Sequence, residues 1–401
     1  MKSDGLPEPM QPVAERIVAL DALRGAALLG VLLVNLESDF RASLFQQMLT
    51  PHLHPGWVNR VTDILIAGVF EFKAITLFSL LFGVGVAVQM ERALAHSANA
   101  TRFLARRFAV LLAIGLCHML LIWNGDILTL YAVCGLLLLP FTGLPARWLA
   151  LLGVALILLA PYLPFFGAFF PAQEVIKAHA VVATQVYAKG NFSEIMQFRW
   201  YEAWRFIAPL LLYTLPRTLG LILCGLAAWR SGVLQRPLEH RRLLTLFLLA
   251  AGSLGVLMTS LQCWASETGQ AKPAALAWLY PYDFTLLALA YGAALLLWLS
   301  HTQSALARWL AAGGRMALSN YLLQSIIFSL IFYGFGLGLF GRLGSAAAAL
   351  LGLTVFAGQL VASTWWLQQF RFGPAEWLWR SLTYGRGQPL RRSPKTVSAV
   401  P

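Results

Sequence analysis

The chain has 401 residues, of which 59% are hydrophobic and only 12% are charged, and its mean hydropathy is +0.68. A soluble domain carries about 25% charged residues, so this chain has too few to cover a water-facing surface. The net charge of +13 does not indicate nucleic-acid binding, because the basic residues lie in short segments between long apolar blocks, where they determine topology and contact lipid headgroups.

Ten apolar blocks follow one another along the chain, each close to the length that crosses a bilayer as a helix. We place them near residues 17–36, 62–90, 108–124, 127–144, 148–170, 206–228, 243–264, 281–300, 316–339 and 345–368. The alternating segments of about ten residues that mark an outer-membrane barrel are absent. The sequence therefore predicts an all-α fold, a polytopic transmembrane bundle of ten spans over residues 16–370.

The polar segments around these blocks predict the topology. Most Lys and Arg residues fall on the side that is cytoplasmic if the N-terminus is inside, so we expect both ends in the cytoplasm. Residues 1–15 lack the order of a cleaved signal peptide and are expected to be a disordered N-terminus. Residues 371–401 are expected to form a cytoplasmic interfacial segment that leads into a disordered tail. Residues 171–205, on the outer side, are expected to form an amphipathic lid.

Ionisable residues inside spans are the most informative, because each costs roughly 2.5–3.5 kcal/mol at the bilayer centre unless it is paired. Asp21 and Arg24, in the first block, share a helix face by their spacing of three. They either neutralise each other or belong to a polar cavity. Asn35, near the end of the same block, is a further candidate for binding substrate.

The second block carries Glu71 and Lys73, whose spacing of two places them on different helix faces. Lys73 is predicted to lie near the midplane and to need a partner from another helix, for which Asp21 is a candidate. Arg217 is similarly deep in the sixth block. Two cations at this depth indicate either buried ion pairs or an anionic ligand.

A histidine and a carboxylate flank the turn between the third and fourth blocks. His118 precedes Asn124-Gly125-Asp126, and an antiparallel hairpin there would bring His118 level with Tyr131. A histidine beside a tyrosine and below a carboxylate can act as a general base. The alternative is a histidine that makes one hydrogen bond between helices.

In the ninth block, Asn320 and Gln324 share a face and are candidates either for substrate binding or for hydrogen bonds between helices. Gly334 and Gly338 form a GxxxG pattern, which favours close helix packing. No nucleotide-binding GxxxxGK[ST] motif occurs, and the four cysteines form no CxxC pair, so we expect no metal site.

Five segments together resemble a known family. They are LDALRGAALLGVLLVN, FKAITLFSLLFGVG, HMLLIWNGDILTLYA, GRMALSNYLLQS and GPAEWLWRSLTYGR. The chain is similar, from about Arg16 to Arg386, to the YeiB-like bacterial membrane proteins, called domain of unknown function 418. This resemblance implies a multi-pass protein of the bacterial cytoplasmic (inner) membrane.

That family is itself similar to transmembrane acyltransferases, which take an acyl group from cytoplasmic acyl-CoA and use a buried histidine. The acetyltransferases among them place this histidine in the loop after the first helix, where this chain has His52 and His54. The YeiB-like motif instead carries its histidine in the third span, here His118.

The leading hypothesis is an acyltransferase-like protein with acyl-CoA as a co-substrate and no permanently bound cofactor. Arg106, Arg107 and Arg315 would hold the CoA phosphates. His118 would act as the base, with Asp126 orienting it and Arg24 or Lys73 stabilising oxyanion charge.

Two alternatives remain from the residues alone, a transporter of a small anionic or amphipathic molecule and a non-catalytic scaffold. The transporter would use Lys73 or Arg217 along its path. The expected partners are the lipid bilayer, a small-molecule, glycan or lipid substrate and a second copy of the chain, but not nucleic acid.

Overall fold

The computed structural model describes residues 18–49, 52–96, 100–163, 171–302 and 304–392. This part of the chain folds into helices, with one isolated β-bridge between Phe370 and Arg391. The predicted all-α bundle is confirmed. The expected N-terminal segment 1–15 and the last residues of the expected tail lie outside the described residues.

The helices are α1 (Val18–Asn35), α2 (Leu44–Leu49), α3 (Trp57–Leu65), α4 (Lys73–His96), α5 (Ala100–Leu121), α6 (Leu128–Leu138), α7 (Ala146–Leu159), α8 (Gln173–Lys189), α9 (Phe192–Glu202), α10 (Ala208–Arg230), α11 (Arg241–Thr268), α12 (Asp283–His301), α13 (Ala305–Arg315), α14 (Ala317–Phe332), α15 (Ser345–Gln369) and α16 (Pro374–Tyr384). Short π-helical segments at Leu36–Phe40, Ile66–Phe70 and Ala203–Ile207 follow α1, α3 and α9.

Each of the ten predicted blocks coincides with an apolar helix, although the helices differ in length. Seven helical segments of the described chain are long and apolar enough to cross a membrane. An eighth span results if α13 and α14, which are bent by 80° at their junction, are counted as one. The described residues of the fourth and fifth blocks include the shorter apolar helices Leu128–Phe141 and Ala146–Tyr162, and residues 164–170 of the fifth block lie outside the described residues. Length and composition therefore identify seven to eight candidate spans among the described residues, against the ten predicted.

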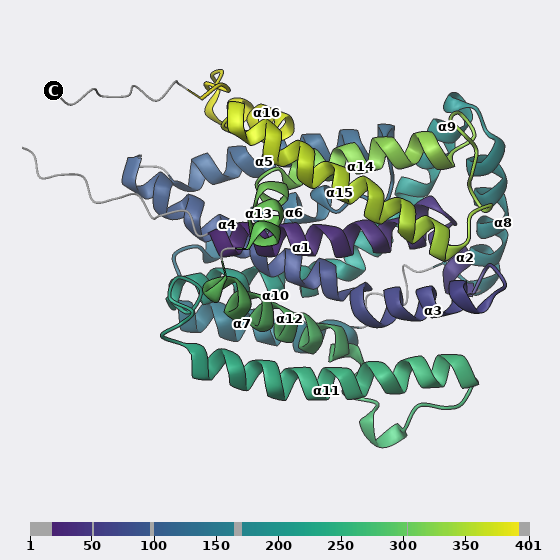
Figure 1. The fold of residues 1–401 in the computed structure, drawn as a ribbon, viewed down its shortest axis with the longest axis horizontal. Helices are drawn as coiled ribbons and strands as arrows, with labels where there is room; N and C mark the ends of the chain where they lie inside the picture. Colours follow the sequence, from purple (N-terminus) through teal and green to yellow (C-terminus); the bar gives the residue numbers. More distant parts are fainter. Residues whose placement is uncertain (1–17, 50–51, 97–99, 164–170, 303, 393–401) are drawn as a thin grey trace, which may run out of the picture.

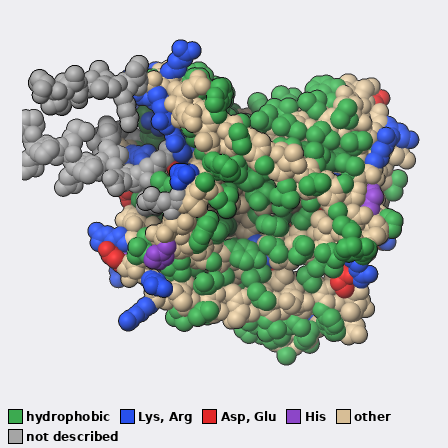
Figure 2. Space-filling view, in the orientation of Figure 1, with side chains coloured by type: hydrophobic (Ala, Val, Ile, Leu, Met, Phe, Trp, Pro, Cys, Tyr) green, Lys and Arg blue, Asp and Glu red, His purple; other side chains and the backbone are tan. Residues whose placement is uncertain are grey.

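The long helices lie side by side and give the bundle two ends (Figure 1). The start of α1 and the C-terminal α16 lie at one end, which we call the tail end. At the opposite end, the loop end, α8 and α9 lie with α2 and α3 (Figure 1). Hydrophobic side chains cover the middle of the face in Figure 2, and charged side chains gather towards its two ends. This distribution is the one expected of a membrane protein.

Close helix crossings at glycine hold the centre of the bundle together. A Cβ atom on Gly25 of α1 would lie 2.1 Å from the Leu310 carbonyl oxygen of α13, and one on Gly314 would lie 1.9 Å from the Asp21 oxygen. Gly83 of α4 packs in the same way against the Ile222 oxygen of α10, at 2.0 Å. Only glycine allows backbones to approach this closely in lipid.

The last described segment, 371–392, contains α16, an amphipathic helix at the tail end. Its tryptophans bond back to the chain, with Trp377 donating to the Gln388 carbonyl and Trp379 to the Arg107 carbonyl. The expected interfacial segment therefore includes an ordered helix that packs on α5.

Candidate functional site

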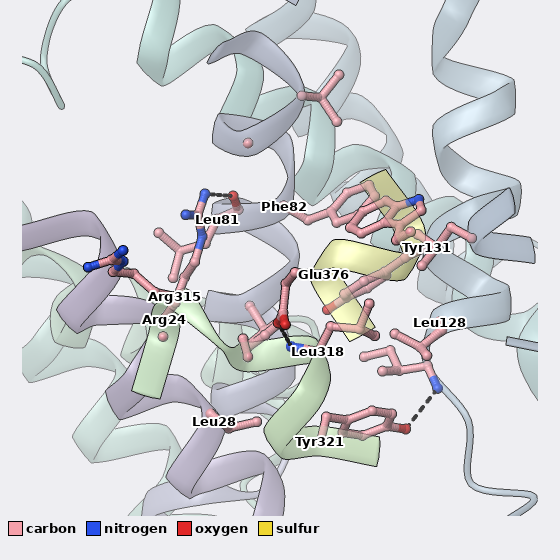
Figure 3. Close-up of a pocket in the computed structure, with 18 of the residues that line it drawn as sticks. Arg24, Leu28, Leu81, Phe82, Leu128, Tyr131, Arg315, Leu318, Tyr321 and Glu376 are labelled. Atoms are coloured by element: carbon pink, nitrogen blue, oxygen red, sulfur yellow. Dashed lines mark hydrogen bonds between the residues drawn. The ribbon is translucent and has the colours of Figure 1, made fainter. Parts of the chain in front are cut away.

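A cavity of about 230 Å³ opens between α1, α4, α5, α6, α14 and α16, and we call it the tail-end cavity. Figure 3 shows this cavity with Arg24 and Arg315 on one side and Tyr131 on the other. Its walls are mainly apolar. Its polar side chains are those of Asp21, Arg24, Gln89, Arg107, Tyr131, Arg315, Tyr321, Glu376 and Trp379.

The predicted pair of the first block lies in this cavity. Arg24 Nη1 donates to Asp21 Oδ1 at 3.2 Å, and Arg24 Nη2 lies 3.4 Å from the Leu81 carbonyl oxygen. The Asp21 side chain is buried, whereas that of Arg24 is 27% exposed. Gly85 leaves room for this guanidinium, since a Cβ there would lie 3.2 Å from Arg24 Nη2. The two alternatives for Asp21 and Arg24 therefore hold together, because the two side chains neutralise each other and also line a polar part of the cavity.

Two of the three arginines expected to bind CoA also line the cavity. The guanidinium of Arg107 stacks on the Trp379 ring, 3.6 Å from its centroid, and Arg315 lies at the end of α13. Arg106 is exposed and lies near Gly385 instead. The predicted phosphate-binding set is therefore divided, with Arg106 outside the cavity.

A carboxyl group from α16 closes one side of the cavity. Glu376 Oε1 accepts from the backbone N–H groups of Leu318 and Ser319, and Oε2 accepts from the Ser319 hydroxyl. These bonds cap the first turn of α14, whose N–H groups have no partner within the helix. Burial raises the pKa of Glu376, although these hydrogen bonds oppose the shift.

His118 and Asp126 form the hydrogen-bonded pair that their positions suggested. His118 Nδ1 and Asp126 Oδ1 are 2.8 Å apart, and both side chains are almost fully buried. Asp126 Oδ2 accepts from the Thr129 backbone N–H at 2.7 Å. If His118 Nδ1 carries the proton, Nε2 is left as an acceptor, and this atom is buried without a hydrogen-bond partner.

Tyr321 lies between His118 and the cavity and was not predicted as a site residue. Its ring contacts the His118 ring, with centroids 5.1 Å apart, and it lines the cavity wall. Its hydroxyl is weakly held, 3.3 Å from the Ile127 nitrogen and 3.4 Å from the Gly125 oxygen. Tyr131 also lines the cavity, but its hydroxyl is 3.0 Å from the Ser79 hydroxyl rather than bonded to His118.

A second cavity, of about 670 Å³, lies towards the other end of the bundle, and we call it the loop-end cavity. Its charged lining residues are Glu37, His52, Asp63, Glu71, Lys73, Glu267, Lys272 and Asp283. Lys73 lies here and not with Asp21. Its Nζ donates to the Ala67 carbonyl oxygen at 2.9 Å and lies 4.0 Å from Asp283 Oδ2. The suggested pairing of Lys73 with Asp21 is therefore wrong.

Arg217 lies beside this cavity, because Phe284, which lines the cavity, packs against its guanidinium at 3.8 Å. Arg217 Nη2 also donates to the Thr76 hydroxyl at 2.6 Å. The five ionisable groups predicted inside the spans thus fall into two sets. Asp21, Arg24 and His118 belong to the tail-end cavity or its wall, whereas Lys73 and Arg217 belong to the loop end.

His52 lies at the loop-end cavity between two carboxylates. Its Nδ1 is 2.8 Å from Asp63 Oδ2, and its Nε2 is 2.7 Å from Glu267 Oε1. Both bonds can form together only when both ring nitrogens carry hydrogen, which makes the ring cationic. The hydrogen bond to Asp63 accordingly raises the pKa of His52.

Three other predicted binding residues line neither cavity. Asn35 ends α1 and is half-buried. Asn320 donates to the Ser363 hydroxyl at 3.0 Å, and Gln324 donates to Gln359 Oε1 at 2.7 Å. These two bonds join α14 to α15, as expected of hydrogen bonds between membrane helices.

The segment expected to be a lid, 171–205, forms α8 and α9 at the loop end. Asn124, in the hairpin of the His118 pair, donates to Glu202 Oε2 at 2.5 Å. His179 Nε2 lies 2.8 Å from the other Glu202 oxygen. The segment therefore bonds to the hairpin directly.

No cluster of His, Cys, Asp or Glu suited to a metal ion occurs among the residues that the structure describes.

The family described as "Protein of unknown function (DUF418)" matches residues 228–386. Uncharacterized protein YxaH of Bacillus subtilis (strain 168) is 34% identical to this chain, over 95% of the chain and 97% of its own length. Uncharacterized protein YeiB of Escherichia coli (strain K12) is 31% identical, over 94% of the chain and 98% of its own length. No solved structure gives a significant match.

Proposed function

The chain belongs to the YeiB-like DUF418 family, and we propose that it is an acyltransferase of the bacterial cytoplasmic membrane that takes its acyl group from acyl-CoA. One observation carries the proposal. A buried, hydrogen-bonded pair of His118 and Asp126 lies behind the wall of a cavity that is lined by arginines and apolar side chains, and Nε2 of this histidine has no hydrogen-bond partner.

The lining of the tail-end cavity suits a ligand with an anionic part and an apolar part. Arg24, Arg107 and Arg315 supply positive charge, and the aromatic rings of Phe78, Phe82 and other residues supply apolar surface. Arginine is well suited to phosphate because its fork of N–H donors matches the phosphate oxygens. In the proposal, the CoA phosphates bind at Arg107 and Arg315, and the thioester extends towards Arg24 and Tyr321.

The proposed reaction is acyl transfer to a hydroxyl or an amine. His118 Nε2 takes the proton of the acceptor, whose oxygen or nitrogen bonds to the thioester carbon while the carbon–sulfur bond breaks. The leaving CoA thiolate then takes the proton from His118, so charge and atoms balance. Asp126 keeps the proton on Nδ1, and Arg24 stabilises the oxyanion. Tyr321 must rotate aside or pass on the proton, and its two long hydrogen bonds, of 3.3 and 3.4 Å, favour such movement.

The test uses the full chain purified in lipid nanodiscs with radiolabelled acetyl-CoA and a longer acyl-CoA. Binding and thioester cleavage are measured for the wild type, His118→Gln and His301→Gln. His301 is an exposed histidine at the end of α12 and serves as the matched control. We expect His118→Gln to bind acyl-CoA but to lose turnover, and His301→Gln to behave as the wild type. Absence of binding at about 1 mM acyl-CoA, a free energy weaker than about −4 kcal/mol, would remove the proposal.

A transporter is the second candidate, and one observation favours it. The continuous helical segment Val18–Phe40, which contains α1 and the π-helical turn after it, lines both cavities, through Asp21, Arg24, Leu28 and Val31 at the tail end and Val34 and Ser38 at the loop end. Two cavities that follow one helical segment suit a substrate path that opens to one side at a time. Uptake or efflux by reconstituted vesicles that is lost in Arg24→Met, without any cleavage of acyl-CoA, would favour this function over acyl transfer.

A further inference from the structure

The floor of the loop-end cavity contains charged groups whose hydrogen-bonding capacity is largely unused. Lys73 and Asp283 are each only 4% exposed, and both line this cavity together with the half-buried Glu71. The Lys73 ammonium has three N–H donors, and its hydrogen bond to the Ala67 carbonyl oxygen uses only one of them. Asp283 accepts at Oδ2 from the Thr259 hydroxyl. In the described part of the chain no hydrogen bond reaches Asp283 Oδ1 or the Glu71 carboxylate.

The ion pair at this floor is also open. Lys73 Nζ and Asp283 Oδ2 are 4.0 Å apart, beyond hydrogen-bonding distance, although both groups are buried. Buried opposite charges repay their desolvation only when they are in contact and fully hydrogen-bonded. A polar group that lies between two partners at such a distance can complete the bonds of both.

Two cations and two carboxylates lie close together at this floor, and their arrangement selects the ligand. Lys73 and Arg217 are opposed by Glu71 and Asp283, with Arg217 held behind the Phe284 ring. A ligand with only a positive charge would meet the Lys73 ammonium, and one with only a negative charge would meet two carboxylates. A ligand that carries both charges satisfies Lys73 and the carboxylates together without adding net charge to a low-dielectric site.

We propose that the loop-end cavity binds a small zwitterion, with its anionic group on Lys73 and its ammonium group on Asp283 and Glu71. The volume of 670 Å³ lies within the usual range for small-molecule sites. Phe72 is 52% exposed, lines the cavity and lies against Phe284, with ring centroids 5.5 Å apart. These two rings provide an apolar surface for the short carbon chain between the two charges. The proposal is independent of acyl transfer, because this site and the tail-end cavity share no lining residue.

The test is a binding titration on the full chain in nanodiscs without acyl-CoA. The probe is β-alanine, and the matched probes are propionate and n-propylamine, which each keep one of its two charges. We expect saturable binding of β-alanine that is at least about tenfold tighter than that of either single-charge probe. Equal binding of all three, or no binding of β-alanine up to about 10 mM, would overturn the proposal.

Variants at the floor and outside it identify the site. Lys73→Met and Glu71→Gln should each weaken β-alanine binding by about tenfold or more. Lys177→Met and Glu174→Gln change exposed residues of α8 at the same end of the bundle and should leave binding unchanged. Glu71→Gln is nearly isosteric and keeps the test available if Lys73→Met does not fold. Unchanged binding in Glu71→Gln, or equal loss in the α8 controls, would place the ligand elsewhere.

Zwitterions of this kind are found free in solution and in lipid headgroups, and a further pair of measurements separates these sources. Glycerophosphoethanolamine carries both charges and should compete with β-alanine whether the natural ligand is a free zwitterion or a lipid headgroup. Replacing phosphatidylglycerol nanodiscs with phosphatidylethanolamine nanodiscs should reduce β-alanine binding only if the intact lipid headgroup reaches Lys73. Failure of glycerophosphoethanolamine to compete would contradict the common zwitterion site.

Discussion

Replacing glycine by alanine should have opposite effects at Gly314, where α13 crosses α1 closely, and at Gly358 of α15, where no atom is near. In Gly314→Ala, the new Cβ would lie 1.9 Å from the Asp21 carbonyl oxygen, so the two backbones must part by about 1.5 Å to restore an ordinary contact. Overpacking of this kind costs about 1–3 kcal/mol, and a backbone obstacle places Gly314→Ala at the upper end. For a chain of 401 residues, we expect the thermal midpoint to fall by roughly 1–4 °C.

Gly358→Ala is the matched control for this prediction. Gly358 lies inside α15, and a Cβ there meets nothing within 4 Å. Alanine should therefore stabilise the helix by about 0.5–1 kcal/mol. Both variants are measured by thermal unfolding in the same nanodiscs, with wild-type protein beside them. If Gly314→Ala and Gly358→Ala shift the midpoint equally, or if Gly314→Ala raises it, the close crossing at the tail-end cavity is refuted.

Three further predictions follow from the sites. In Asp126→Asn, an amide N–H₂ takes the place of the acceptor for His118 Nδ1, so the His118 proton moves to Nε2. Acyl-CoA turnover should then fall about 10²–10⁴-fold while acyl-CoA binding is retained. Unchanged turnover would contradict the role of His118 as the base. Glu376→Ala removes the cap of α14 and should cost about 1–2 kcal/mol by thermal unfolding, whereas Glu376→Gln should cost less; equal effects contradict a role for the carboxylate. Because the folded pKa of His52 is raised, its contacts with Asp63 stabilise the fold fully below about pH 6.5 and are lost as the pH rises through the folded pKa. The midpoint difference between wild type and His52→Gln should therefore shrink from pH 5.5 to pH 9, and a constant difference contradicts this.

The bundle could be predicted from the sequence because lipid imposes local rules. Every backbone N–H and C=O in hydrocarbon must bond within its own segment, so an apolar block of sufficient length becomes a helix whatever its neighbours are. The helix lengths were less predictable. The helices α6 and α7 end at Leu138 and Leu159, because prolines follow closely at Pro140 and Pro161.

The pairing of side chains shows where sequence reasoning succeeded and failed. His118 and Asp126 are eight residues apart across one turn, so local geometry was enough to bring them together. Lys73 Nζ lies 4.0 Å from Asp283 Oδ2, 210 positions further along the chain, because α4 packs beside α12. No sequence spacing reveals that the two residues are neighbours. The structure therefore distributes the charged groups of the spans between two cavities.

Two residues of the tail-end cavity, Tyr321 and Glu376, were not predicted from the sequence, because neither residue type by itself indicates a site at its position. Tyr321 is an aromatic residue within an apolar helix, and Glu376 lies in a segment expected to be an interfacial tail. A signal was present, since both lie within the segments GRMALSNYLLQS and GPAEWLWRSLTYGR, on which the resemblance to the YeiB-like family rests. Hydrogen bonds from the Leu318 and Ser319 backbone N–H groups to Glu376 join these two segments in the fold.

The most direct test of acyl transfer is an experimental structure of the chain in nanodiscs with a thioether analogue of acyl-CoA, which cannot be cleaved. We predict density in the tail-end cavity, with the phosphates near Arg107 and Arg315 and the thioether sulfur close to Tyr321. An empty tail-end cavity at saturating analogue, or an analogue bound elsewhere in the bundle, would contradict the account.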